Sequence, residues 1–270
     1  MSIQSLLSKD LSVHVLSECF AVHSDLITII EEFPTQAHLL PMSDSLMLGV
    51  AIGMAIDGSF PIVQLADLDS LYDLLPQLSR ELKSGFPLGM ALKVPCSNLN
   101  SVDLNLFSGL AVSVYCAQNQ EHTDALLAEA KLSRQPTIIL ESLSLMSSQK
   151  KKKFSGDVEV LSEGTELSLL VWGDAINIAL DIAEKYASQD ISLEIIALHD
   201  LFSEDPVIRN SVNKTGRVIC INQSNSLSKT LFANSFWHLE AEPVFCSAGT
   251  SDIANAIQNV LAPLVKGKRI

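Results

Sequence analysis

Residues 41–65 read PMSDSLMLGVAIGMAIDGSFPIVQL and join a helix signal directly to a strand signal. Ser43 and Asp44 carry oxygens that can accept hydrogen bonds from the free backbone N–H groups of a first helical turn. The residues that follow are almost all apolar, so we expect a helix over 44–56 that is buried on nearly all sides. A glycine and a proline then lead into an apolar strand at 62–65.

Two glycines of this helix, Gly49 and Gly53, are four residues apart and therefore share one face. Without side chains, they let another backbone come close to the helix. A helix this apolar would leave a large hydrophobic patch on a monomer, so we expect another domain or subunit to cover it.

The same stretch resembles the pyrimidine-binding domain of thiamin-diphosphate enzymes, in particular the beta subunit of the decarboxylating component of 2-oxo acid dehydrogenases. In that family, a Ser-Glu segment caps a glycine-containing helix, and the Glu contacts N1′ of the cofactor's aminopyrimidine. Asp44 stands at the matching position and is one methylene shorter. The resemblance implies a catalytic and cofactor-binding role for Asp44. The alternative is that Asp44 only caps the helix and favours its positive end.

The segment after the 62–65 strand is the one that places aromatic side chains beside the pyrimidine in that family. Here it reads ADLDSLY over residues 66–72, with one aromatic residue. The resemblance therefore implies that Leu68 and Tyr72 line the cofactor site together with Asp44.

The family's phosphate side carries a Gly-Asp-Gly motif followed by Asn, whose oxygens suit magnesium. This chain has no Gly-Asp-Gly, no G-x-G-x-x-G and no P-loop, so it offers no metal-ligating residues for that purpose. The resemblance implies that thiamin diphosphate would be shared with a phosphate-binding-domain subunit that holds the Mg²⁺. The expected assembly is a homodimer or an α2β2 heterotetramer.

A glycine-rich loop that ends in a His-Ser pair is the third family feature, and here residues 95–101 read PCSNLNS. This loop has neither His nor Gly, so the catalytic His loop is missing. His122 lies further along, where we expect a neighbour of a helix cap or a surface residue. His199 next to Asp200 is expected to form a local hydrogen bond.

The composition limits the partners and the location of the chain. Its 270 residues carry a net charge of −13, which argues against nucleic acid and anionic membranes as partners. The five cysteines show no CxxC spacing and are interpreted as free thiols of a reducing compartment. No signal peptide or apolar run long enough to span a membrane is apparent, so we expect a cytoplasmic protein.

Strand-like and helix-like runs alternate along the chain, a pattern typical of α/β domains with mainly parallel sheets. The expected strands are 11–16, 37–40, 62–65, 90–94, 110–116, 136–141, 167–172, 192–198, 217–222 and 243–247. The expected helices are 24–33, 44–56, 69–83, 121–134, 175–188, 205–213, 228–238 and 251–265. The helix at 69–83 is expected to be capped by Asp69 or Ser70 and contains Pro76.

Between 142 and 164 the periodicity fails, and four lysines stand at 150–153. We therefore expect two three-layer α/β/α domains: a pyrimidine-binding domain at 1–145, a linker at 146–164 and a second domain at 165–270. The second domain resembles the C-terminal domain of the transketolase family through 165–170, TELSLL, and through 213–218, NKTGRV, the turn before its central strand. The lysines are interpreted as a solvated linker, with anion binding as the alternative.

Two functions remain open from the sequence. The first is a beta-type subunit of a thiamin-diphosphate 2-oxo acid dehydrogenase or decarboxylase, with Asp44 at N1′ and activity impaired by the shorter side chain. The second is a non-catalytic homologue that keeps the transketolase-like fold as a dimerising or protein-interaction module. The residues do not identify the 2-oxo acid or the partner subunit.

Overall fold

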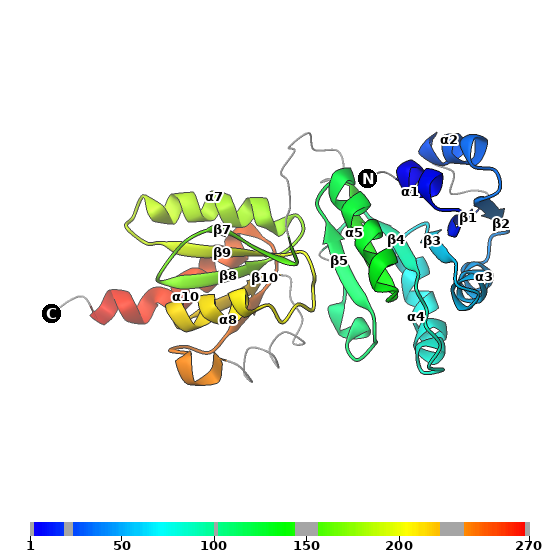
Figure 1. Cartoon of the computed structure of the whole chain (residues 1–270). Coiled ribbons are helices and arrows are strands. Elements are labelled where there is room, and N and C mark those ends of the chain that lie inside the picture. The colour runs from blue at the N-terminus through cyan, green and yellow to red at the C-terminus, as the bar shows by residue number, and fades with distance from the viewer. Residues whose placement is uncertain (1–2, 19–23, 100–101, 144–155, 222–234, 268–270) are drawn as a thin grey trace. The chain divides into compact units, whose positions relative to one another are not determined.

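The computed structural model describes residues 3–18, 24–99, 102–143, 156–221 and 235–267. It divides into two compact units, and Figure 1 shows the elements of both. The first unit comprises 1–97 and 109–153, and the second comprises 98–108 and 154–270. The second unit thus takes in 98–108, a segment that we expected in the first domain; its 3-10 turn, Leu104–Phe107, buries both end residues.

The first unit contains a six-stranded sheet in the order β2-β1-β3-β4-β6-β5, and every strand pair in it is parallel. Its strands are β1 (Val13–Glu18), β2 (Ala37–Leu40), β3 (Phe60–Gln64), β4 (Ala91–Cys96), β5 (Ser113–Ala117) and β6 (Thr137–Ser142). The nearly continuous burial of strands such as β3 and β6 is what a parallel sheet covered on both faces requires.

Five helices accompany this sheet: α1 (Ile3–Lys9), α2 (Ser24–Glu32), α3 (Asp44–Ile56), α4 (Leu68–Leu82) and α5 (Gln120–Ser133). Buried residues of α1, α2 and α5 form one core cluster with Val13, Val15 and Ile62 of the strands. Because side chains of a strand alternate between its faces, the neighbours of these strand residues point to the opposite face. There α3 packs on β1 and β3, and α4 packs on β4.

Helix α3 is not buried on all sides within this chain, contrary to our expectation. Met47, Leu48, Ala51, Ile52 and Ala55 form its buried face. A second stripe is exposed, and we call it the α3 stripe: Leu46, Gly49, Gly53 and Ile56. Both end residues of the α3 stripe are 47% exposed, which leaves an apolar helix face without cover in the described part of the chain.

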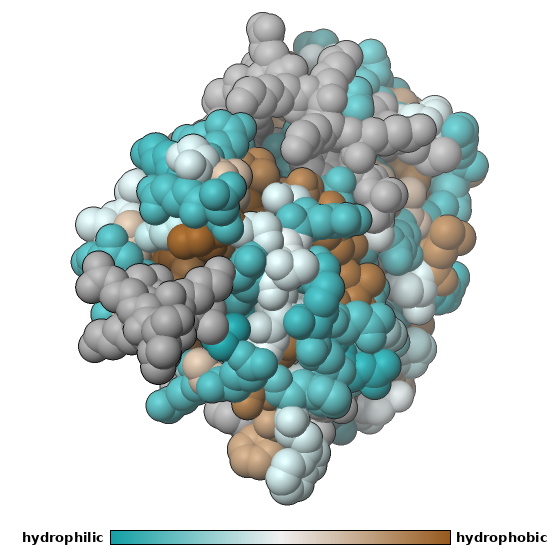
Figure 2. Space-filling view, turned by 90° about the vertical axis from the view of Figure 1, so that its left-hand side faces the viewer, coloured by the Kyte–Doolittle hydropathy of each residue, from teal (hydrophilic) through white to brown (hydrophobic). Residues whose placement is uncertain are grey.

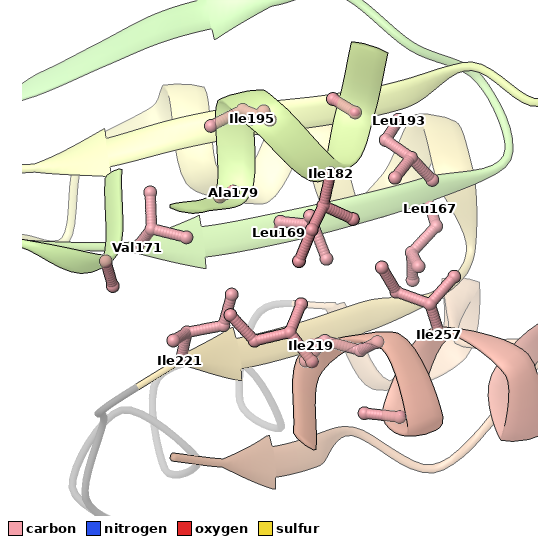
Figure 3. Packing of buried hydrophobic residues seen from close by; sticks show 14 of the residues in the cluster. Leu167, Leu169, Val171, Ala179, Ile182, Leu193, Ile195, Ile219, Ile221 and Ile257 are labelled. Atoms are coloured by element: carbon pink, nitrogen blue, oxygen red, sulfur yellow. The ribbon is translucent and has the colours of Figure 1, made fainter. Parts of the chain in front are cut away.

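The second unit contains a five-stranded sheet in the order β11-β10-β8-β9-β7. Its strands are β7 (Val158–Ser162), β8 (Leu167–Val171), β9 (Leu193–Leu198), β10 (Val218–Ile221) and β11 (Val244–Cys246). All pairs are parallel except β7 with β9. Its helices are α7 (Ala175–Ala187), α8 (Pro206–Thr215), α10 (Thr250–Gly267) and the 3-10 turn Phe236–His238. Figure 3 shows how Ile182 of α7 and Ile257 of α10 meet side chains of β8 and β10 in one core.

Several local expectations differ from the structure. Residues 158–162 form the antiparallel edge strand β7, although we expected them in the linker. Only the first residue of this strand is buried, so the sequence shows no clear strand periodicity. The middle strand of the second sheet is β8, and β10 lies beside it. The N-cap of α4 is Asp67, whose side chain accepts from the Ser70 N–H at 2.9 Å. Helix α1 was not anticipated.

Some expectations fall outside the described residues: the linker segment 146–155 with its four lysines, Cys19, and most of the helix expected at 228–238. Within the described residues, the expectation of two α/β units with mainly parallel sheets is confirmed. No helix there is long and apolar enough to cross a membrane. On the face drawn in Figure 2, hydrophilic residues alternate with groups of hydrophobic residues.

Candidate functional site

Three acidic side chains gather at the carboxyl ends of the strands of the first sheet. In the sheet, β2 lies on one side of β1 and β3 lies on the other. The chain therefore reverses the direction in which it adds strands at β1. Ligands of open α/β sheets bind at such a switch point, outside the carboxyl ends of the strands. Glu18 is the last residue of β1, Asp44 is the first residue of α3, and Asp67 precedes α4.

Glu18 and Asp44 form a pair of neighbouring carboxyl groups. Two ionised carboxylates are acceptors only and repel each other, so a proton on Glu18 relieves the repulsion. Burial first, and the Asp44 charge second, raise the pKa of Glu18, whereas a hydrogen bond from the Ser43 backbone N–H opposes the rise. The pair can therefore hold a proton at a position where a ligand would meet it.

The Asp44 side chain does not cap its helix, although it still lies in the first turn, where its charge favours the positive helix end. The N-cap of α3 is Ser43, whose Oγ accepts from the Leu46 N–H at 3.3 Å. Oδ1 of Asp44 is buried and has no hydrogen-bond partner among the described residues. A buried acceptor without a partner costs stability, which makes this oxygen a candidate contact for a ligand.

The first turn of α3 is tied to α4 by a side-chain contact. Gln77 of α4 donates from Nε2 to the Ser45 carbonyl oxygen at 3.2 Å. This bond fixes the helix start that carries Asp44 relative to α4 and its cap residue, Asp67. The Asp67 charge also contributes to raising the pKa of Glu18, which brings three carboxyl groups into one acidic neighbourhood.

Leu68 and Tyr72, the other residues implied by the family resemblance, occupy one face of α4. Leu68 begins the helix and Tyr72 lies one turn later, and both are half-buried. Helix α4, which carries both residues, packs against α3, which carries Asp44. Joint contact of Leu68, Tyr72 and Asp44 with one ligand stays a prediction.

The histidines do not join this acidic group. His122 is not a surface residue: it is buried next to the Asn119 cap of α5, and its Nδ1 accepts from the Gln118 N–H at 3.3 Å. Burial lowers the pKa of His122 to about 4, so it is neutral at pH 7. His199 of the second unit is fully buried, with Nε2 3.7 Å from Oε2 of Glu159.

The described residues contain no cluster of three or more His, Cys, Asp or Glu side chains that could hold a metal ion. A small pocket exists at the opposite edge of the first sheet, where Asp10, Phe60, Lys131 and Arg134 line it. Because it lies at the amino ends of β1 and β3, away from the switch point, we do not place the site there.

Sequence reasoning found Asp44 but missed Glu18 and Asp67. Glu18 ends the apolar run VHVLSE, and a charged residue that closes a buried strand is a usable signal. Asp67 carried a signal too, since an Asp before a helical pattern is a cap candidate. The proximity of the three carboxyl groups depends on tertiary structure, because β1 ends, and α3 and α4 begin, at the same edge of the sheet.

The chain is similar in sequence to known proteins. Residues 156–228 match the family model described as transketolase, C-terminal domain. The chain is 23% identical over 207 residues to the pyruvate dehydrogenase E1 component subunit beta of Bacillus subtilis, covering 68% of this chain and 64% of that subunit. The Acholeplasma laidlawii subunit of the same name is 24% identical over 234 residues, covering 76% and 72%.

The fold is similar to that of solved structures as well. A split-gene transketolase described as an inactive beta4 tetramer has a TM-score of 0.75 at 16% identity, over 96% of this chain and 94% of that one. A transketolase from Campylobacter jejuni has a TM-score of 0.67 at 12% identity, over 95% of this chain and 45% of that one. The chain therefore has the two-unit fold of these proteins and spans less than two thirds of the Bacillus subtilis subunit.

Proposed function

Because the chain is a transketolase-like protein of the pyruvate dehydrogenase E1 beta type, we propose that it contributes the pyrimidine side of a thiamin-diphosphate site in a 2-oxo acid dehydrogenase or decarboxylase. The observation that carries this proposal is the Glu18–Asp44 pair at the switch point of the first sheet. When bound, thiamin diphosphate supplies the carbanion chemistry of 2-oxo acid decarboxylation.

The residues present fit the pyrimidine end of this cofactor. Oδ1 of Asp44 is a buried acceptor without a partner in the described chain, and the proton on Glu18 offers a donor beside it. N1′ of the aminopyrimidine is a hydrogen-bond acceptor, so a carboxyl group can hold it only through a proton, which the Glu18–Asp44 pair would supply. Asp44 would hold the ring nitrogen, and Glu18 would keep the proton of the pair in place.

The missing methylene of Asp44 is the main reason to expect impaired activity. A shift of about 1 Å in a reacting group can cost on the order of a hundredfold in rate. The charges of Asp44 and Asp67 raise the pKa of Glu18, which favours the protonated form of the Glu18 carboxyl group. We propose that the pair still binds the cofactor but positions it less well.

The diphosphate and its Mg²⁺ are assigned to a partner subunit, because this sequence has no Gly-Asp-Gly motif. The relatives are named as subunits of a multi-subunit enzyme component, which supports such a partner. A cytoplasmic location is part of the proposal, supported by the free thiols of Cys96, Cys116, Cys220 and Cys246.

The test is calorimetric titration of thiamin diphosphate with Mg²⁺ into the chain, alone and mixed with a co-encoded phosphate-domain subunit. We expect binding by the mixture and at least a tenfold loss of affinity in Asp44→Ala. Asp57→Ala, at the far end of α3, is the matched control and should bind like the wild type. Absence of binding by the mixture, or equal binding by Asp44→Ala, would contradict the proposal.

A second candidate function, a non-catalytic dimerising module, is favoured by the uncovered α3 stripe. A Cβ on Gly53 would meet no atom within 4 Å, so this face is open to a partner backbone. The split-gene transketolase is described as a beta4 tetramer that is inactive, which supports self-association of such a chain. The proposed assembly is a homodimer, or an α2β2 heterotetramer when the partner is present.

Gly53→Leu tests this association. The isolated chain should fold at least as well, since leucine is the better helix former by up to about 1 kcal/mol. Its self-association, measured by sedimentation, should weaken at least tenfold, because the new side chain blocks close approach. Asp181→Leu, on an exposed position of α7, is the control. Unchanged association in Gly53→Leu would exclude the α3 stripe as the interface.

A further inference from the structure

Two histidines outside the acidic site face each other across the edge of the first sheet. His14 lies on β1 and His38 on the edge strand β2, and both side chains are half-buried. The distance from Nδ1 of His14 to Nε2 of His38 is 3.1 Å. Their ring centroids are 5.3 Å apart, with the planes tilted by 31°.

The backbone that carries these rings is held firmly. Gln36, buried next to β2, donates from Nε2 to the carbonyl oxygens of Val13 at 2.8 Å and Asp10 at 2.9 Å. The Gln36 carbonyl oxygen accepts from the Val15 N–H at 2.8 Å. The start of β1 and the start of β2 are thereby locked together, and only side-chain rotation remains free for the two histidines.

We propose that His14 Nδ1 and His38 Nε2 form a two-histidine site for a divalent transition-metal ion such as Zn²⁺ or Cu²⁺. Imidazole nitrogens are preferred ligands of both ions. Two nitrogens that each lie about 2.0–2.1 Å from one ion are roughly 3 Å apart when they occupy neighbouring coordination positions. The observed separation matches that requirement, so small rotations of the rings suffice to aim both lone pairs at one ion.

In the metal-free chain, the same two nitrogens share one hydrogen bond, which needs a proton between them. A metal ion would replace this proton, and both imidazoles must be neutral for it to bind.

The site offers open coordination positions. No third His, Cys, Asp or Glu of the described residues joins the pair as a ligand group. Because β2 is an edge strand, water or an external ligand can complete the coordination sphere. We therefore expect weaker binding than at structural zinc sites with four protein ligands.

The direct test is titration of the untagged full-length chain with Zn²⁺ by calorimetry and with Cu²⁺ by electron paramagnetic resonance. We expect one ion per chain, and at least a tenfold loss of affinity in both His14→Ala and His38→Ala. The copper spectrum should show two coupled imidazole nitrogens in the wild type and fewer in either variant.

His238→Ala removes an exposed histidine of the second unit and is the matched control, expected to bind like the wild type. Circular dichroism of each variant checks that the sheet is intact. Affinities that are equal in the wild type and both pair variants, a copper spectrum without two coupled nitrogens, or no binding at all would overturn the proposal.

Discussion

Both units of the molecule bury glutamates, and two of these residues, Glu194 and Glu18, have opposite surroundings. Glu194 of the second unit is 3% exposed and accepts from Ser211 Oγ and from Lys214 Nζ, each at 2.5 Å. Ser168 extends this network, 2.7 Å from Ser211 Oγ and 2.7 Å from Thr215 Oγ1. Glu18 of the first unit is 9% exposed and faces Asp44 and Asp67, two groups of its own charge.

The difference separates a structural role from a functional one. A buried carboxylate with a cation and hydroxyl donors is satisfied within the chain and holds β9 to α8. A carboxyl pair with an unpartnered oxygen lowers stability, and proteins keep such arrangements mainly where a ligand completes them. On this view, the second unit is scaffold, and the first unit carries the incomplete half of a site.

The largest expected effect comes from breaking the satisfied network. Glu194→Ala leaves the buried Ser211 hydroxyl and the Lys214 ammonium group without their acceptor and should lower the free energy of unfolding by about 3 kcal/mol. Both tryptophans, Trp172 and Trp237, belong to the second unit, so urea unfolding followed by their fluorescence reports this unit.

The control for that variant is Glu184→Ala, at an exposed position of α7, which should change the free energy by less than about 0.5 kcal/mol. A loss of less than about 1 kcal/mol in Glu194→Ala would mean that this hydrogen-bond network contributes little to the stability of the second unit.

A smaller effect concerns the pH dependence of the first unit. The pKa of buried His122 is lowered from its ordinary value of 6.5 to about 4. Below pH 6.5 the unfolded chain takes up a proton that the folded chain refuses, so stability falls as the pH drops toward 4. The loss should reach about 2 kcal/mol at pH 5.

His122→Asn should remove this loss, measured as the difference in unfolding free energy between pH 7 and pH 5. Hydrogen exchange of the β5 amides gives the readout for the first unit. His238→Asn, at an exposed position, should keep the wild-type difference. If His122→Asn also kept the wild-type difference between pH 7 and pH 5, the buried neutral imidazole would not be the cause of that difference.

The smallest expected effect is a gain in the stability of the first unit. The pKa of Glu18 is raised, so the folded chain binds its proton more tightly than the unfolded chain. That contribution to stability is complete below about pH 4.5 and is lost as the pH rises through the raised pKa. Glu18→Gln keeps a hydrogen-bond donor for Asp44 without the charge and should stabilise the first unit by up to about 1 kcal/mol at pH 7.

Glu31→Gln, at an exposed position of α2, is the control for charge removal and should be close to neutral. Hydrogen exchange of the β1 amides at pH 7 compares the two variants. A destabilised Glu18→Gln would show that Glu18 is satisfied in the same way as Glu194.

The sequence was informative where periodicity and burial agree. The strand pattern, the helix at Asp44–Ile56 and the order of elements follow from apolar runs that need no tertiary information. Strand β7 was missed because VEVLS is half polar and lies at a sheet edge. The exposure of the α3 stripe could not be predicted from the sequence either. A helix with apolar residues on every side does not indicate which face the rest of the chain leaves exposed.

The site was predictable only in part. Asp44 stood out through its motif, whereas Glu18 has no local motif and gains its meaning from a residue 26 positions later in the chain. The His14–His38 contact was equally invisible, since the two residues have no ligand spacing and meet only because β1 and β2 pair in parallel.

The most direct test of the central claim measures stability and cofactor affinity together in Glu18→Gln and Asp44→Asn, each assembled with the phosphate-domain subunit. The account predicts that stability is kept or raised in both variants while the affinity for thiamin diphosphate falls at least tenfold. Variants that lose stability and bind the cofactor with unchanged affinity would show that the acidic pair belongs to the scaffold and not to a site.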